Sequence, residues 1–118
     1  MKYLLMIYEN ESDYGADKAG AALDAIVAEH RAFAAELGPV LVGGAGLKNS
    51  ATATTVRTRA GAKAIHDGPF AETKEQLGGF YLVDVPDLDA AIALARRIPL
   101  LGEGAVEIRP VLAEDDEA

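Results

Sequence analysis

The chain has 118 residues, of which 50% are apolar and 25% are charged, a composition that fits one globular domain with a single core. It contains no cysteine, which excludes disulfides, thiolate metal sites and cysteine nucleophiles. Its net charge of −8 argues against a nucleic-acid partner, because such a surface repels phosphates.

The start of the chain resembles neither a secretory signal nor a membrane anchor. The apolar run before Glu9 is too short for the apolar core of a signal peptide. No stretch of the chain approaches the roughly 20 apolar residues that a helix needs to cross a bilayer. We therefore expect a cytoplasmic protein with no membrane partner.

The first third of the chain predicts a strand followed by a helix. The short apolar run 2–8 favours a buried strand, and the polar segment 10–15 favours a loop. From about Asp17, a candidate N-cap, to Leu37, apolar residues recur every three or four positions, as they do on one face of a helix. A Gly-Pro dipeptide at 38–39 is expected to end that helix.

The middle of the chain predicts three short strands. Residues 40–42 favour a strand that runs into the glycine-rich segment 43–46, where glycines would allow a bulge or close packing of backbones. β-Branched and polar residues alternate over 52–59, the pattern of a half-exposed strand. Residues 63–66 follow a turn at Gly61 and are expected to pair back as a hairpin.

The last third of the chain predicts a strand, a helix and a strand. A loop is expected over 66–76 and a long strand over 77–85. Asp87 is the predicted N-cap of a second helix, which Pro99 ends. Residues 106–112 favour a final strand.

This order of elements predicts an α+β domain of the ferredoxin-like type over residues 1–112. Two interleaved right-handed β-α-β units give an antiparallel sheet with both helices on one face. The second face would stay uncovered, and an exposed apolar sheet face is unstable in water, so we expect a homodimer that covers it. The acidic residues 113–118 are expected to form a solvated, disordered tail.

His30 stands on the centre line of the apolar stripe of the first predicted helix, four residues after Ile26 and four before Ala34. A histidine in this position is either a core residue with one hydrogen-bonding partner or a group directed into a pocket. The residues alone leave both interpretations open.

The segment 66–76 gathers polar and charged groups around a rigid turn. Gly68 followed by Pro69 restricts the backbone, so Asp67 would be held in place. On a structural interpretation, Asp67 caps the turn, Phe70 fills the core and the other charges are solvated. On a functional interpretation, the segment lines a site with the side chains of His66, Phe70, Glu72, Lys74 and Glu75.

No metal or cofactor motif is present in the sequence. His30, His66 and Asp67 belong to residue types that ligate zinc or iron, but they lack the close spacing of a metal-binding motif. The glycine-rich segment 43–46 matches neither a phosphate loop nor a dinucleotide-binding pattern. We therefore expect neither a metal nor a cofactor.

Several segments together resemble the DGPF branch of the YCII-related family. The most specific begins at Asp67 and reads DGPFAETKEQLGGFYLVDVPDLDAAIALARRIP; MKYLLMIYE, HRAF at 30–33 and ATATTVRTR match as well. The resemblance extends from Met1 to about Leu112. It implies a ferredoxin-like fold that dimerises through its sheets into an α/β barrel. Small-molecule isomerases, dehydrochlorinases and cofactor-free monooxygenases share that architecture.

The resemblance also implies a histidine–aspartate pair. His30 matches the histidine that YCII-related proteins carry on the first helix. The parent family's Asp-Pro-Phe follows the second helix, whereas this chain has Arg97-Ile98-Pro99 there, so Asp67 in Asp-Gly-Pro-Phe is the candidate acid. DGPF proteins are often encoded beside extracytoplasmic-function sigma factors, which implies a regulatory alternative.

Two functions follow as expectations. The first is an enzyme that acts on a small organic substrate by general acid–base chemistry, with His30 as the base and Asp67 orienting it. Lys74 or Tyr81 would stabilise developing oxyanion charge. The second is a non-catalytic module that binds a ligand or a partner protein, with the 66–76 loop at the contact. Fold class cannot decide between them, because this architecture hosts many functions.

Overall fold

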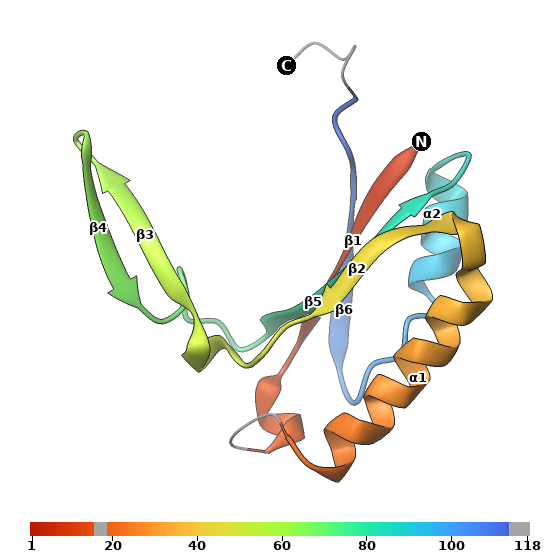
Figure 1. Ribbon diagram of the computed structural model, residues 1–118, viewed down its shortest axis with the longest axis horizontal. Coiled ribbons are helices and arrows are strands. Elements are labelled where there is room, and N and C mark those ends of the chain that lie inside the picture. Colours follow the sequence, from red (N-terminus) through yellow and green to blue (C-terminus); the bar gives the residue numbers. More distant parts are fainter. Residues whose placement is uncertain (16–18, 114–118) are drawn as a thin grey trace.

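A four-stranded antiparallel sheet carries the fold, and its strands lie in the order β2-β5-β1-β6 (Figure 1). They span Lys2–Glu9 in β1, Leu41–Gly46 in β2, Gln76–Asp84 in β5 and Gly104–Pro110 in β6. The structure, a computed structural model, describes residues 1–15 and 19–113. Two interleaved β-α-β units produce this strand order, so the expected ferredoxin-like α+β fold is confirmed.

The side chains of β1 alternate between the two faces of the sheet. Leu5 and Ile7 point toward the helices and are buried, whereas Leu4 and Met6 lie on the opposite face and are only partly covered. Full burial of a side chain such as Leu5 contributes about 1.5–3 kcal/mol relative to leaving it in water. The inward face of β1 therefore supplies the centre of the core.

Both helices cover the same face of this sheet (Figure 1). Helix α1 spans Ala21–Leu37 and helix α2 spans Leu88–Ala95. Phe33 of α1 and Ala91 of α2 belong to one buried cluster with the inward-facing strand residues. Asp87 caps α2 as predicted, because its side chain accepts a 2.9 Å hydrogen bond from a backbone N–H of the first turn. No helix among the described residues is long and apolar enough to cross a membrane.

The start of α1 differs from the prediction. The helix begins at Ala21 and its N-cap is Gly20, whereas the predicted N-cap, Asp17, lies outside the described residues. Its end is as predicted, because Gly38 adopts a positive φ of 55° and stops the helix. Residues 114–118 of the predicted acidic tail also lie outside the described part of the chain.

Short 3-10 helices, which were not predicted from the sequence, join the larger elements. Within the described residues they span Glu11–Tyr14, Gly38–Val40 and Ser50–Thr52. Asn10 and Asn49 cap two of them, since each side chain accepts a 3.1 Å hydrogen bond from the backbone N–H two residues later. The cap at Asn49 explains why the strand predicted from residue 52 begins only at Thr54.

A separate two-stranded sheet forms a hairpin that projects from the four-stranded sheet (Figure 1). It consists of β3, Thr54–Arg59, and β4, Ala62–Asp67. The turn residues Ala60 and Gly61 have φ values of 50° and 80°. Positive φ at both positions belongs to the type I′ turn, whose twist matches that of the paired strands. The predicted hairpin is confirmed.

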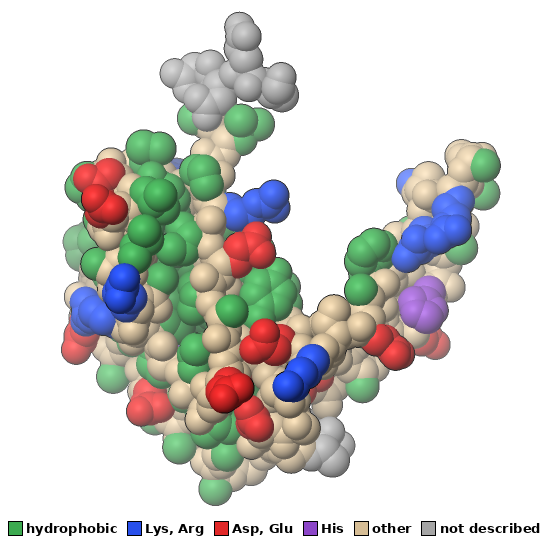
Figure 2. All heavy atoms as spheres, turned by 180° about the vertical axis from the view of Figure 1, so that it is seen from behind, with side chains coloured by type: hydrophobic (Ala, Val, Ile, Leu, Met, Phe, Trp, Pro, Cys, Tyr) green, Lys and Arg blue, Asp and Glu red, His purple; other side chains and the backbone are tan. Residues whose placement is uncertain are grey.

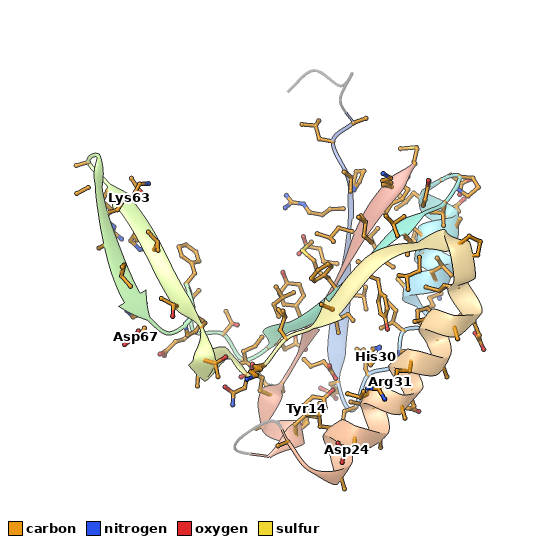
Figure 3. The ribbon with its side chains drawn as sticks, in the orientation of Figure 1. Tyr14, Asp24, His30, Arg31, Lys63 and Asp67 are labelled. Atoms are coloured by element: carbon orange, nitrogen blue, oxygen red, sulfur yellow. The ribbon has the colours of Figure 1, made fainter. Side chains whose placement is uncertain are left out.

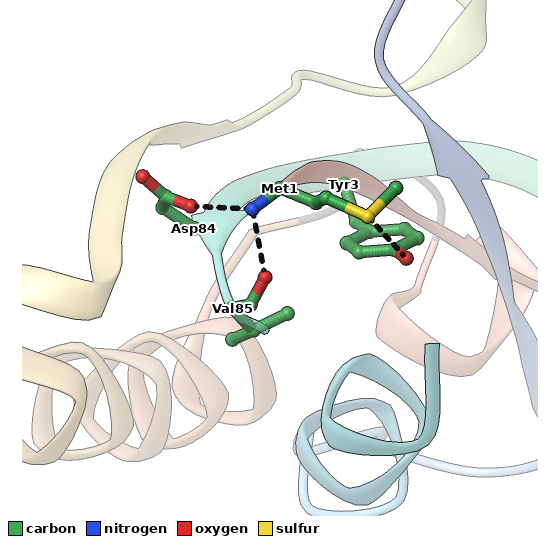
Figure 4. A network of polar contacts seen from close by, with 4 residues as sticks. All are labelled: Met1, Tyr3, Asp84 and Val85. Atoms are coloured by element: carbon green, nitrogen blue, oxygen red, sulfur yellow. Dashed lines mark hydrogen bonds and ion pairs between the residues drawn. The ribbon is translucent and has the colours of Figure 1, made fainter. Parts of the chain in front are cut away.

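The N-terminal ammonium group fastens the start of β1 to the end of β5 (Figure 4). It donates hydrogen bonds to Asp84 Oδ1 at 3.1 Å and to the Val85 carbonyl oxygen at 2.9 Å. Both Met1 and Asp84 are exposed, so the ion pair contributes only about 0–1 kcal/mol to stability. These contacts mainly hold the two chain segments in register.

Gly44 allows β2 to approach β5 closely. A Cβ at this position would lie 2.7 Å from the Phe80 carbonyl oxygen, a backbone atom that cannot move without the strand. The register of β2 also shifts between Leu41 and Gly43, which marks a bulge. Both roles predicted for the glycine-rich segment are therefore present.

We predict that Gly44→Ala lowers the free energy of unfolding by about 1–3 kcal/mol, because the added methyl group forces β2 and β5 apart. Gly43→Ala is the matched control, since a Cβ there meets no atom within 4 Å, and it should change stability by less than about 0.5 kcal/mol. Urea unfolding followed by circular dichroism measures both values. Equal stabilities for the two variants would contradict the close approach at Gly44.

Candidate functional site

A cavity of about 290 Å³ lies between α1 and the β2–β5 side of the sheet. Helix α1 contributes an apolar wall that includes Leu23, Ile26 and Val27. The polar and charged side chains that line the cavity are Glu9, Tyr14, His30, Arg31 and Tyr81. A mostly apolar hollow with a few polar groups has the usual character of a small-molecule site.

Glycines open the floor of this cavity. Gly44 and Gly46 of β2 and Gly79 of β5 stand at positions where inward-facing side chains would otherwise fill the space. A Cβ at Gly46 would meet no atom within 4 Å. The cavity therefore extends to the backbone of β2, and a larger residue at Gly46 would occupy it.

His30 extends from α1 toward the sheet (Figure 3). Its Nδ1 atom lies 2.7 Å from the Tyr81 hydroxyl oxygen, a hydrogen-bonding distance. Tyr81 is buried, and Phe33 packs edge-on against its ring with the centroids 5.6 Å apart. The half-buried imidazole is thus oriented by a phenol that is itself held in the core. His30 both lines a cavity and has a hydrogen-bonding partner, so the two interpretations of this residue are compatible.

The Tyr81 phenol keeps its proton at neutral pH. Burial raises the pKa of Tyr81 above its ordinary value, because the phenolate would lose its hydration. The hydroxyl then donates to Nδ1 of one imidazole tautomer or accepts from Nδ1–H of the other. In each case, the second ring nitrogen of His30 takes the opposite donor or acceptor role.

Glu9 and Tyr14 form a second polar pair at the cavity. The Tyr14 hydroxyl lies 2.9 Å from each Glu9 carboxylate oxygen, and the Leu101 backbone N–H donates to Glu9 Oε2 at 3.0 Å. Burial raises the pKa of Tyr14, and the hydrogen bond to Glu9 and the charge of that carboxylate raise it further. These bonds satisfy a carboxylate that is only 6% exposed.

Three polar residues of the cavity were not predicted from the sequence: Glu9, Tyr14 and Arg31. Glu9 had a readable signal, because it continues the inward alternation of Leu5 and Ile7 with a carboxylate instead of an apolar side chain. Tyr14 follows a polar segment, and Arg31 is an exposed residue beside His30 (Figure 3). Neither had a local pattern that marked it.

The structure does not bring His30 and Asp67 together within one chain. Figure 3 shows them on opposite sides of the molecule, with His30 on α1 and Asp67 at the end of β4. The reason is that the β3–β4 hairpin extends away from the sheet rather than folding over α1. Tyr81, which was predicted to stabilise an oxyanion, lies in the cavity and holds the position beside His30 that was expected for the acid.

The other predicted site residues belong to the hairpin and the loop after it. Phe70 is 71% exposed, so the structural interpretation, in which it fills the core, is wrong. The Arg57 guanidinium lies 4.9 Å from its ring centroid instead, and Phe70 and Glu75 line a different hollow at the base of the hairpin. The exposed residues of this region include His66, Glu72 and Lys74.

Residues 1–15 and 19–113 contain no group of three His, Asp or Glu side chains that could hold a metal ion. His30 lies at the cavity, whereas His66 and Asp67 lie on β4. The set considered for zinc or iron is therefore not assembled within the chain.

Comparison with known proteins relates these features to a family. A family model for the YCII-related domain matches residues 1–115. An uncharacterised protein of Rhizobium meliloti (strain 1021) is 38% identical over an alignment of 118 positions, and that alignment covers 94% of this chain and 92% of that protein. Neither match names a substrate or a reaction.

Stability should fall at alkaline pH through the two buried phenols. The pKa values of Tyr14 and Tyr81 in the folded state lie above the unfolded value of about 10. Their contribution is therefore fully present below about pH 10, and the free energy of unfolding falls as the pH rises further, because the unfolded chain loses these protons first. Urea unfolding between about pH 8 and pH 11 measures this loss. Tyr81→Phe and Tyr14→Phe should each reduce it, and an unchanged pH dependence would contradict the raised pKa of that phenol.

Proposed function

This chain belongs to the YCII-related domain family, and we propose that its cavity binds a small, mostly apolar organic molecule. The His30 imidazole, oriented by Tyr81, exchanges a proton with that molecule as a general base or acid. The observation that carries this proposal is the 2.7 Å hydrogen bond between a half-buried histidine and a buried phenol at the wall of an apolar cavity.

An imidazole suits proton exchange, because its ordinary pKa lies near neutral pH. The apolar walls strengthen the electrostatic interaction between the ring and a charge that develops on the ligand. Arg31 also lines the cavity, and its positive charge would favour a ligand that becomes more negative as it loses a proton. Isomerisation and elimination are reactions that begin with such a proton transfer.

The dimensions of the cavity limit the ligand. Its volume of about 290 Å³ lies just below the roughly 300–1,000 Å³ that is usual for ligand sites, so the ligand is small. The open space at Gly46 would let a flat part of the ligand lie against the backbone of β2. Asp67 and Lys74 lie on the hairpin and its following loop, so in this proposal Tyr81 replaces Asp67 as the group that orients His30.

The uncovered face of the four-stranded sheet supports a homodimer. Both described α-helices lie on the other face. On the uncovered face, apolar side chains of β1 and β5 lie side by side as register partners: Leu4 with Leu82 and Met6 with Phe80. Apolar faces of this kind are typical of protein–protein contacts. In the proposed dimer, the uncovered faces of two chains pack against each other.

The alternative function is a non-catalytic module. It would bind a ligand in the same cavity without turnover, or bind a partner such as a sigma factor through the loop that carries Glu72 and Glu75. The exposure of Glu72 fits such a contact but does not select a partner. A cytoplasmic location remains a prediction for both functions.

Hydrogen–deuterium exchange of ligand protons tests the catalytic proposal without knowledge of the final product. Small carbonyl compounds with an acidic C–H bond are incubated with the protein in D₂O, and proton NMR follows the loss of that signal. His30→Ala should slow the catalysed exchange by about 10² or more, since general acid–base groups contribute roughly 10²–10⁴. Tyr81→Phe should slow it less, because the imidazole remains present.

A cavity-filling variant is the matched control for this experiment. Gly46→Leu should abolish ligand binding, because the new side chain occupies open space, and it should leave the chain folded. Undiminished exchange by His30→Ala would refute the acid–base role. Ligand binding that is lost in Gly46→Leu, but never accompanied by exchange in the wild type, would favour the non-catalytic module.

A further inference from the structure

The β3–β4 hairpin stands apart from the rest of the protein as an arm. Within residues 1–15 and 19–113, its strands pair only with each other, and every residue of β4 is exposed. Figure 2 shows the arm separated from the body of the molecule by a wide hollow. A two-stranded hairpin is at best marginally stable in water without a surface to pack on, so this arm needs a cover.

Contacts at the base of the arm join its two strands and leave its outer part exposed. The Gly68 backbone N–H donates to the Ala53 carbonyl oxygen at 2.7 Å, and the Thr55 hydroxyl donates to the Gly68 carbonyl oxygen at 2.8 Å. Arg57 packs over the Phe70 ring near this base. These contacts join the two ends of the hairpin, and its apolar residues Val56 and Ile65 stay exposed.

An apolar pair lies on one face of the arm. Val56 and Ile65 are register partners on neighbouring strands, so their side chains stand side by side. Val56 is 59% exposed and Ile65 is 76% exposed. Exposed β-branched residues on a bare two-stranded ribbon are typical of a contact surface, because burying their apolar side chains is favourable.

The charge of the arm is opposite to that of the whole chain. Thr54–Asp67 carries Arg57, Arg59 and Lys63 against the single carboxylate of Asp67, whereas the chain has a net charge of −8. The cations gather along the arm in Figure 2. Lys63 lies on the same face of the arm as Val56 and Ile65, and Arg57 and Arg59 lie on the opposite face. The arm as a whole is complementary in charge to the acidic body of another copy of this chain, which also offers an uncovered apolar sheet face.

We infer that the arm is a clamp that packs on a second copy of the chain, with Val56 and Ile65 buried at the contact. This inference rests on the homodimer proposed above and adds to it a second contact region beyond the sheet face. A nucleic-acid partner fits less well, because the arm has only three cations, whereas the chain as a whole has a net charge of −8 and would repel phosphates. A second copy carries the complementary charge by itself.

Sedimentation equilibrium tests the inference with substitutions on the two faces of the arm. Val56→Asn and Ile65→Asn should each raise the dimer dissociation constant roughly tenfold or more, as expected for a buried apolar contact residue. Ala64→Asn is the matched control on the other face of β4; it leaves the charge of the arm unchanged and should change the constant much less. Equal effects of Ile65→Asn and Ala64→Asn would overturn the assignment of this face.

Thiol labelling gives a second test, which measures the burial of a residue in the dimer rather than the dimer dissociation constant. The chain has no cysteine, so Ile65→Cys and Ala64→Cys each provide one thiol for a maleimide probe. Labelling of Ile65→Cys should slow at least about tenfold as the protein concentration rises through the dimer range, and Ala64→Cys should slow much less.

The outcomes separate the arm from the sheet-face dimer. If the protein dimerises but Ile65→Cys is labelled at the same rate at all concentrations, the clamp is refuted. If Leu82→Asp also prevents dimerisation in that case, the sheet-face dimer is supported. If the wild-type protein is monomeric at every concentration, both proposals fail. Protection of Ile65→Cys that requires added DNA or another protein would also overturn the clamp.

Discussion

The Tyr81 side chain connects the rigid core of the protein to its cavity. Its ring packs edge-on against Phe33 inside the main hydrophobic cluster, and its hydroxyl holds His30 at 2.7 Å. Tyr81 lies on β5, which has strands on both sides, so the ring cannot shift without disturbing the sheet. The imidazole is therefore oriented by the most constrained layer of the fold, as a site built on rigid elements requires.

The cavity beside this pair exists because side chains are missing from the sheet. Gly44 and Gly79 are needed for close approach of β2 and β5, since a Cβ at either would lie within 3 Å of a backbone oxygen. A Cβ at Gly46 would meet no atom within 4 Å, so close packing does not require a glycine at this position, and the space beside it is open. Unfilled apolar space costs stability, so an inward glycine without a packing role favours a hollow that serves a ligand.

Local patterns predicted the elements better than the site. The strand predicted from the apolar run 2–8, the Gly-Pro end of the first helix and the Asp87 cap depend on neighbours in sequence, and each is present in the structure. His30 was recognised for the same reason, because it interrupts an apolar stripe. Its partner Tyr81 is 51 residues away, and its position depends on how β5 lies beneath α1. The resemblance implied an aspartate partner, and Asp67 was the candidate for it. That the hairpin carries Asp67 away from His30 is a tertiary property that residue spacing does not encode.

Long-range ¹H–¹⁵N NMR of the two histidine rings tests the central claim most directly. The chain contains only His30 and His66, so a single substitution assigns both sets of signals. If Tyr81 holds the His30 ring, Tyr81→Phe will shift the Nδ1 resonance of His30, whereas the resonances of His66, exposed on β4, will not change. Identical His30 signals in the wild type and in Tyr81→Phe would contradict the pairing on which the proposed site depends.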